Sequence, residues 1–342
     1  MRVVSRSICL TGGSTYIISL PKEWIKMHGL SKGSQVSLLL LSDGSLLVRP
    51  TGRPKTVDNI VTIKIDDSMT PDKLVRKLIA YYIAGYDIIE VKAPEGMSLD
   101  FKNSIRSAIK RMLFGAELVD ESMEYIRIQI LTRSINIPID KLLTRMSNIA
   151  LNMHLDAMRA LRSKDRDILK EIIERDDDVD RLYFLIVRLL ASAIYKPYEA
   201  LELGISDPIE ALEYRLVARH LERVADHATI ISSMYLDILN ELNHSIVSIL
   251  SRMCNAGKEA LTLAMDSLVN MDLEKAEKAI KKRFDMRDLE DEAVNKLYEL
   301  GNPRVIAALR MAIESYRRVS EYSAGIAEIA INISARKSNI KV

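Results

Sequence analysis

The sequence predicts a multidomain protein with a small β-rich domain, a small α/β domain and an all-α region of tandem three-helix bundles. Short β-type runs broken by glycine turns fill about the first fifty residues. Aromatic residues make up only 5 % of the chain, and Leu, Ile, Ala, Glu, Lys and Arg dominate its second half, which is typical of long helices. The helical segment Leu221–His227 is similar to the segment Tyr316–Tyr322, which lies 95 residues later, and this similarity indicates an internal repeat.

The length and the distribution of charge set the expected domain organisation. A chain of 342 residues is long enough for two or three domains. We place the boundaries at residues 1–50, 56–137, 138–241 and 242–342, the last two being the two helical repeats. The first 55 residues carry eight Lys and Arg against two acidic residues, whereas acidic residues slightly outnumber basic ones in the rest. The first domain is therefore the candidate for an anionic partner.

The first domain is expected to alternate short strands with sharp turns. A helix begins at Pro21, because proline suits the first helical turn, and ends at Gly29, which suits a helix C-terminus. The expected elements are strands at 3–10 and 16–20, a helix at 21–29, and strands at 36–41 and 45–49 around a hairpin turn. A domain with so few apolar residues cannot form a stable hydrophobic core by itself, so we expect oligomerisation to stabilise it.

Five pieces of this segment resemble the AbrB/SpoVT swapped-hairpin DNA-binding domain: Thr11–Ser14, Ser19–Trp24, His28–Leu30, Lys32-Gly33 and Asp43–Leu46. The resemblance implies a homodimer whose two chains interleave their hairpins and present basic residues to DNA. Lys and Arg near phosphates release counterions, which supplies most of the non-specific affinity. Our candidates for the DNA-binding surface are Arg2, Arg6, Lys22 and Lys26. The alternative is a domain that only forms the dimer. In either case we expect Trp24, the only tryptophan, to anchor the dimer core rather than to contact a ligand.

Residues 56–137 predict a small βαβαβ unit. The expected strands are 60–65, 87–91 and 125–131, and the expected helices are 70–84 and 99–114. Ala93–Gly96 has too few glycines for a nucleotide-binding loop, so we expect a turn there. This segment carries no recognisable chemistry, and we expect a spacer or an interface.

Residues 138–342 are expected to be helical throughout. Breaks at Ser163–Asp165, Met271-Asp272 and Gly301–Pro303, and a loop between Pro197 and Gly204, divide the region. The expected helices are 141–161, 165–194, 208–240, 245–269, 273–300 and 304–336. They form two three-helix units in tandem, and short loops favour antiparallel bundle packing.

The first helical unit carries two pairs of carboxylates at the spacing of one helical turn. Asp176 and Asp180 lie on its second helix, and Glu222 and Asp226 lie on its third. Residues four apart share one helix face, so like charges there repel each other and need compensation. Antiparallel packing would place both pairs together, and hard cations prefer clustered oxygen ligands. The alternative is ordinary ion pairing on solvated faces with Arg175, Arg181, Arg219 and Arg223.

The second unit has largely inverted this charge. A register without gaps aligns Arg283 and Arg287 with Asp176 and Asp180, Arg317 with Glu222, and Glu321 with Asp226. In the alternative register, shifted by one residue, Asp285 and Asp288 restore some of the acid. A guanidinium cannot ligate a metal, so we expect no second metal site of this kind. The three arginines can form ion pairs with Glu290, Glu314, Glu321 or Glu328. Such ion pairs would hold the helices together without a metal, and we call this arrangement a staple. The arginines can also form an anion site, because arginine forks suit phosphate.

Residues 138–342 resemble the PhoU family of phosphate-signalling proteins, which are built from two three-helix repeats. The resemblance rests on Glu174–Leu182 and Leu221–His227. It implies that Asp176, Asp180, Glu222 and Asp226 bind iron or another divalent or trivalent metal, and the inverted charge of the second unit limits this site to the first repeat. It also implies a role in restraining phosphate uptake. His220 and His227 flank the acidic pair but lack the spacing of di-iron bundles, so we expect them to be structural.

These observations predict a phosphate-responsive regulator that binds DNA through residues 1–50 and controls phosphate uptake or transport genes. Its expected partners are DNA, a second copy of the chain, and a phosphate transporter or signalling protein. We expect no enzyme activity, no membrane insertion and no disulfide framework between Cys9 and Cys254, and therefore a cytoplasmic protein. The alternatives are an interaction module that acts on a phosphate transporter without binding DNA, and a catalytic metal-carboxylate bundle.

Overall fold

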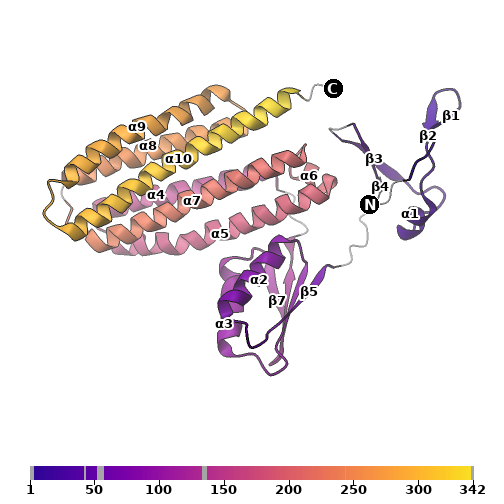
Figure 1. Cartoon of the computed structure of the whole chain (residues 1–342), viewed down its shortest axis with the longest axis horizontal. Helices are drawn as coiled ribbons and strands as arrows, with labels where there is room; N and C mark the ends of the chain where they lie inside the picture. The colour runs from indigo at the N-terminus through magenta and orange to yellow at the C-terminus, as the bar shows by residue number, and fades with distance from the viewer. Residues whose placement is uncertain (1–3, 42–43, 52–57, 133–136, 243, 340–342) are drawn as a thin grey trace. The chain divides into compact units, whose positions relative to one another are not determined.

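A computed structural model describes residues 4–41, 44–51, 58–132, 137–242 and 244–339 (Figure 1). The chain divides into two compact units, Met1–Asp58 and Asn59–Val342. The first unit pairs β1 (Cys9–Thr11) with β2 (Thr15–Ile17) and β3 (Val36–Leu40) with β4 (Leu46–Pro50), both antiparallel, and contains helix α1 (Lys22–Met27). The first strand is shorter than we expected, and Arg2 and the turn residues Ser42 and Asp43 lie outside the described residues.

The first unit has no core of its own among its described residues. None of them is buried, and large apolar side chains stand open to solvent. The exposed fractions are 68 % for Ile8, 75 % for Tyr16, 62 % for Leu38 and 69 % for Leu40. So much exposed apolar surface on so small a unit indicates a face that another molecule covers.

The second unit begins with a four-stranded sheet in the order β5-β6-β8-β7. Strands β5 (Ile60–Lys64) and β6 (Ile88–Lys92) are parallel, and β8 (Tyr125–Ile130) pairs antiparallel with both β6 and β7 (Ala116–Glu121). Helices α2 (Pro71–Ile83) and α3 (Leu99–Arg111) follow β5 and β6 in turn. Leu74, Leu78, Ile105 and strand residues such as Ile89 and Ile128 form the buried core.

The expected βαβαβ order was incomplete, because the structure contains one more strand. Strand β7, with the sequence Ala-Glu-Leu-Val-Asp-Glu, has three acidic residues and little intrinsic β propensity. It forms a strand because it pairs with β8 across a hairpin, with an irregularity between Leu118 and Asp120. Pairing with β8 in the folded state therefore makes this segment a strand, which its own amino-acid composition does not predict.

The rest of the second unit consists of long helices. Their bounds are α4 (Ile139–Ser163), α5 (Arg166–Tyr195), α6 (Pro197–Glu202), α7 (Pro208–Ile238), α8 (His244–Asn270), α9 (Leu273–Leu297) and α10 (Pro303–Asn339). The expected loop after Pro197 contains the short helix α6, because the proline occupies a first-turn position where its missing N–H costs nothing. None of the helices in the described ranges is both long and apolar enough to cross a bilayer.

Two antiparallel bundles share one continuous core. Helices α4, α5 and α7 form the first bundle and α8, α9 and α10 the second, and α7 packs along α10 between them (Figure 1). Buried residues from both bundles belong to a single apolar cluster. The phenol oxygens of Tyr235 on α7 and Tyr316 on α10 lie 3.1 Å apart within it. The two repeats therefore fold as one body.

A buried arginine joins the sheet region to the first bundle. Arg188 on α5 donates hydrogen bonds to the carbonyl oxygen of Tyr82 and, at 3.1 Å, to the hydroxyl of Thr132. Its guanidinium lies 3.7 Å from the carboxylate of Asp87 and stacks over the Tyr82 ring. Both charged side chains are less than 10 % exposed. The ion pair therefore fixes α5 against the strand that Asp87 precedes.

Replacing Arg188 by methionine is expected to lower the free energy of unfolding by about 3 kcal/mol, because it leaves the buried Asp87 carboxylate without its guanidinium. Urea unfolding followed by circular dichroism measures the change. Arg304→Met is the control, because the Arg304 side chain is 67 % exposed and its loss should cost less than about 0.5 kcal/mol. Equal stabilities for the two variants would contradict this account of the junction.

Candidate functional site

The acidic face of the first bundle is formed by helices α5 and α7. Asp165 caps the start of α5 by accepting hydrogen bonds from the N–H groups of Asp167 and Ile168, at 3.0 and 3.1 Å. Asp207 caps α7 in the same way. Each helix buries its apolar stripe in the core, and this fixes which residues remain on the polar face.

The structure brings the four expected carboxylates close enough to repel one another. Burial, followed by the charges of Asp180 and Asp226, raises the pKa of Asp176 from 3.8 to about 7. Burial and the charge of Asp226 likewise raise the pKa of Asp180 to about 6 and that of Glu222 to about 7. Antiparallel packing of α5 on α7 therefore joins the two pairs into one negatively charged cluster.

The two pairs differ in how they are compensated. Arg219 lies 2.6 Å from one carboxylate oxygen of Glu222, and Arg223 lies 2.8 Å from Asp226. The other oxygen of Glu222, Oε2, is buried and accepts no hydrogen bond, with only the Arg223 Nε atom 3.7 Å away. Asp176 and Asp180 make no hydrogen bond or ion pair with any described residue.

Ion pairing by neighbouring arginines, our alternative for this face, therefore holds for α7 but not for α5. Arg175 turns away to Asp156 and Glu171, at 2.8 and 2.6 Å. Arg181 stacks over the ring of Phe114 in the sheet region. Neither arginine pairs with Asp176 or Asp180, so these two carboxylates are left without an ion pair to any described residue.

One further cation lies at the site, and no sequence pattern predicts it. Arg111, at the end of α3 in the sheet region, donates a 2.7 Å hydrogen bond to Asp177. This bond raises the pKa of the Arg111 guanidinium, and the charges of Asp180 and Asp176 add to the effect. Arg111 and Asp177 are 66 residues apart and belong to different predicted domains, so no local pattern connects them.

The donor set suits a hard metal ion. All four side chains offer carboxylate oxygens, Asp176 and Asp180 lack partners, and Glu222 holds a buried oxygen without a hydrogen bond. Among the described residues, no three His, Cys, Asp or Glu side chains already stand close enough to hold a metal ion. A cation would therefore have to draw Glu222 and Asp226 away from Arg219 and Arg223.

The corresponding place in the second bundle has the opposite charge. Arg283 and Arg287 on α9 and Arg317 and Glu321 on α10 all line one pocket of about 220 Å³. These are the four residues that the gap-free register aligns with the acidic cluster, so the two sites occupy equivalent places in the two repeats.

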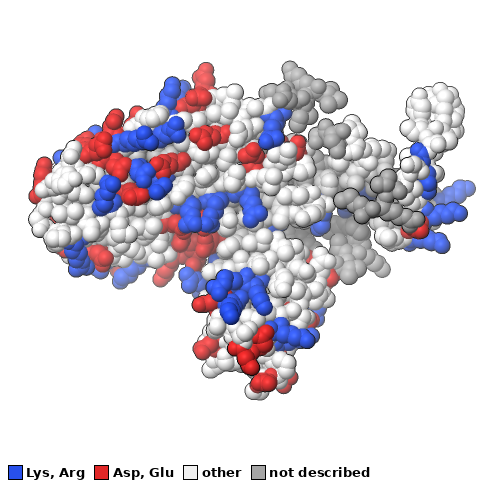
Figure 2. Space-filling model, viewed as in Figure 1, with Lys and Arg blue, Asp and Glu red and all other residues white. Residues whose placement is uncertain are grey.

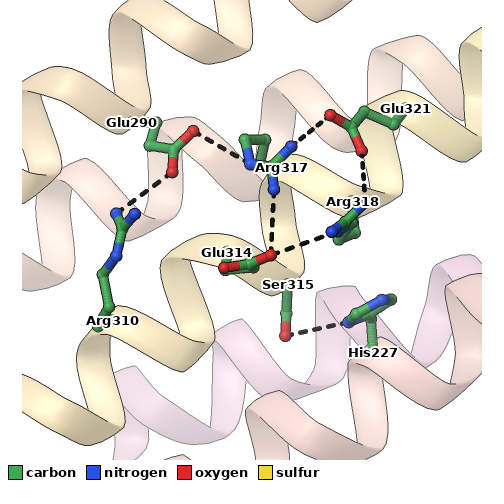
Figure 3. A network of polar contacts seen from close by, with 8 residues as sticks. All are labelled: His227, Glu290, Arg310, Glu314, Ser315, Arg317, Arg318 and Glu321. Carbon is green, nitrogen blue, oxygen red and sulfur yellow. Dashed lines mark hydrogen bonds and ion pairs between the residues drawn. The ribbon is translucent and has the colours of Figure 1, made fainter.

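Arg317 is held by carboxylates on three sides, as Figure 3 shows. It contacts Glu290 at 3.2 Å, Glu314 at 3.0 Å, and Glu321. Arg318 joins Glu314 to Glu321 at 3.3 and 3.1 Å. The expected staple is therefore present around Arg317, where guanidinium replaces the carboxylate of the first repeat.

The histidines join the two bundles. His227 Nδ1 lies 3.1 Å from the Ser315 hydroxyl (Figure 3), and the rings of His220 and His227 both pack against Tyr322 on α10. No sequence pattern points to His154, which is fully buried behind α7 with its Nε2 atom 2.7 Å from the carbonyl oxygen of Val224. Burial lowers the pKa of His154 to about 4, so it is neutral at physiological pH.

Comparison with known proteins finds similarity in two parts of the chain. The PhoU domain model matches residues 143–234 and 250–330, just over half of the chain. A model described as "Antidote-toxin recognition MazE, bacterial antitoxin" matches residues 10–56. A curated relative, the phosphate-specific transport system accessory protein PhoU homolog of Clostridium acetobutylicum, is 28 % identical over 168 residues, which cover 46 % of this chain and 71 % of that protein.

Two solved structures are similar to the helical region. The phosphate transport system regulatory protein PhoU from Streptococcus pneumoniae has a TM-score of 0.49 and 18 % identity, covering 57 % of this chain and 92 % of its own. PhoU from Pseudomonas aeruginosa has a TM-score of 0.49 and 17 % identity, covering 58 % of this chain and 96 % of its own.

The raised pKa values predict that Asp176→Asn stabilises the metal-free protein at alkaline pH. The folded-state pKa of Asp176, about 7, lies above its ordinary value of 3.8, so folding disfavours the charged form. This group costs the wild type no stability below about pH 4, and an increasing amount as the pH rises toward 7. The full shift corresponds to ~4 kcal/mol, and solvent screening reduces the expected gain at pH 8 to about 1–2 kcal/mol.

Urea unfolding between pH 4 and pH 8 in the presence of a chelator measures this gain. The difference between Asp176→Asn and the wild type should vanish near pH 4. The control is Asp178→Asn on the same helix, because Asp178 is exposed and should change little at either pH. A variant that is less stable than the wild type at pH 8 would show that the carboxylates do not repel one another.

Proposed function

The chain belongs to the PhoU family, and from this premise we propose that it regulates phosphate transport and binds DNA as a dimer through its N-terminal unit. The observation that carries the proposal is the union in one chain of a PhoU domain and a MazE-like β unit. The relatives matched by the helical region are named for phosphate transport and its regulation. The β unit would add a DNA-binding output that acts on transport genes.

The open apolar surface of the N-terminal unit supports the homodimer. With Ile8, Tyr16, Leu38 and Leu40 exposed, each copy offers strand residues that a second copy would cover. Each strand pair is an isolated two-stranded hairpin, which is marginally stable alone in water. Interleaving two copies would give both hairpins a shared core.

Charge supports DNA as the ligand of this dimer. Arg6, Lys22 and Lys26 are exposed in the first unit, and Arg2 remains a candidate from the sequence alone. Figure 2 shows blue side chains gathered on this unit, whereas blue and red are mixed over the helical bundle. A basic surface with few acids provides the electrostatic attraction on which most DNA affinity depends.

The acidic cluster supports a single metal site per chain, in the first bundle. Asp176, Asp180, Glu222 and Asp226 would bind iron or another divalent or trivalent ion, which would cancel their mutual repulsion. Such a cation would also lessen the pull on Arg111, which lies beside the cluster on Asp177. The state of the bundle would then reach the sheet region as a change in charge at the end of α3, provided that two conformations differ in their affinity for the signal.

A second function, protein recognition without DNA binding, draws support from one observation. The family model that matches residues 10–56 is described as one of antidote–toxin recognition, which is protein binding. On this alternative the N-terminal unit would only form the dimer or bind a partner protein, and the helical region would act on a transporter or signalling protein. Loss of DNA affinity with an intact dimer distinguishes the two.

Reversing the charge at Arg2, Arg6 and Lys22 to glutamate is expected to weaken DNA binding at least about tenfold, because three phosphate-facing cations become anions. A gel shift at low salt with the promoter region of the protein's own gene measures the affinity. The matched control reverses Lys110, Lys278 and Lys281, which are exposed and lie in the second unit. Light scattering checks that each variant is still a dimer. The proposal fails if the wild type binds none of the DNA tested.

The double variant Asp180→Asn/Glu222→Gln removes one carboxylate from each helix and is expected to lower metal affinity at least about tenfold. Elemental analysis after anaerobic loading with ferrous iron, and separately with manganese, measures the metal bound per chain. Glu274→Gln/Glu277→Gln is the control, because both residues are exposed on α9 of the second bundle. Unchanged metal content in Asp180→Asn/Glu222→Gln would place any metal elsewhere.

A further inference from the structure

The pocket in the second bundle has the features of a binding site. It encloses about 220 Å³ between α9 and α10, and its charged lining consists of Arg283, Arg287, Arg317, Glu321 and Glu328. Pockets for drug-sized ligands span roughly 300–1,000 Å³, so this one suits a smaller molecule. Three guanidinium groups in one small space repel each other unless an anion or a carboxylate compensates them.

The carboxylates compensate only one of the three arginines in full. Arg317 contacts Glu290, Glu314 and Glu321 and is firmly held at one side of the pocket. Glu321 is engaged by Arg318 as well, so its charge is already neutralised. This part of the lining is a rigid support.

The protein's own acidic groups leave Arg283 weakly paired and Arg287 unpaired among the described residues. The closest acid to Arg283 is Glu328, at 4.0 Å, and Glu328 is 56 % exposed. The Nε–H group of Arg283 is buried and donates no hydrogen bond. Among the described residues, Arg287 forms no hydrogen bond or ion pair and only lies near the ring of Phe284, 5.8 Å from its centroid.

We propose that this pocket binds a small oxyanion of the phosphate class through Arg283 and Arg287, while Arg317, held in place by its ion pairs, forms one side of the pocket. Guanidinium forks match the geometry of tetrahedral oxyanions and form two parallel hydrogen bonds to them. The anion would replace the weak contact of Glu328 with Arg283 and give the buried Nε–H group its acceptor. The two repeats would thus use equivalent places for ligands of opposite charge, a cation in the first and an anion in the second.

Isothermal titration of inorganic phosphate into the full-length chain tests this proposal. The protein is treated with a chelator first, so that a metal in the first bundle cannot hold the phosphate. We expect saturable binding by the wild type and at least a tenfold loss in Arg283→Gln/Arg287→Gln. The matched control is Arg252→Gln/Arg304→Gln, whose ion pairs with Glu292 and Asp237 lie outside the pocket and whose affinity should equal that of the wild type.

Further titrations identify the ligand, and a second variant controls for loss of folding. Sulfate should compete with phosphate, whereas chloride at equal ionic strength should not. Pyrophosphate and ATP distinguish free phosphate from the phosphate of a larger molecule, because the pocket should favour the smaller anions. Arg283→Lys/Arg287→Lys keeps the charge but loses the fork, and we expect an intermediate affinity together with an unchanged helical spectrum.

Two results would overturn the proposal. One is the absence of saturable phosphate binding by the wild type, and the other is equal binding by Arg283→Gln/Arg287→Gln. Neither result bears on DNA binding or on the acidic cluster, which are measured without phosphate. Failure here therefore leaves the proposed function standing, and the reverse also holds.

Discussion

The packing of α7 against α10 is the constraint from which both candidate sites follow. An α-helix that buries one stripe fixes the direction of every other residue, because successive residues are turned by a constant angle. On α7 the buried stripe includes Leu221 and Val224, so Glu222 and Asp226 are directed to α5. On α10 the buried Tyr316 and Val319 leave Arg317 directed to α9 in the same way. The burial of apolar surface on α7 and α10 thus determines which way the charged side chains of each helix point.

The two repeats show that one helical framework can support opposite electrostatics. In the first, carboxylates repel each other until a cation or an arginine compensates them, and their raised pKa values express that cost. In the second, Arg317 takes the place of Glu222 and is surrounded by acids instead. The apolar core tolerates this exchange because the charged side chains lie at its margin, where water and neighbouring ions share the cost.

The sheet region is more than a spacer, because two arginines tie it to the first bundle. Arg188 forms a buried junction with Asp87 and the carbonyl of Tyr82, whereas Arg111 reaches Asp177 at the partly exposed edge of the acidic cluster. The first contact holds the two parts together. The second lies beside the acidic cluster, and the charges of Asp180 and Asp176 contribute to the raised pKa of Arg111.

The sequence by itself determined the three kinds of structure, the tandem repeat, the long helices and the pairing of Asp176, Asp180, Glu222 and Asp226 on helix faces. These features follow from local periodicity, caps and spacing, which any single helix carries along its own length. Only the tertiary structure decided that β7 is a strand, that Arg111 joins the acidic cluster, and that Arg175 turns away from it. It also decided that Arg283 and Arg287 line one pocket and that the buried Nε–H group of Arg283 donates no hydrogen bond. Each of these features depends on contacts between segments far apart in the chain. The residue pattern of one helix or strand does not determine which distant segment packs against it.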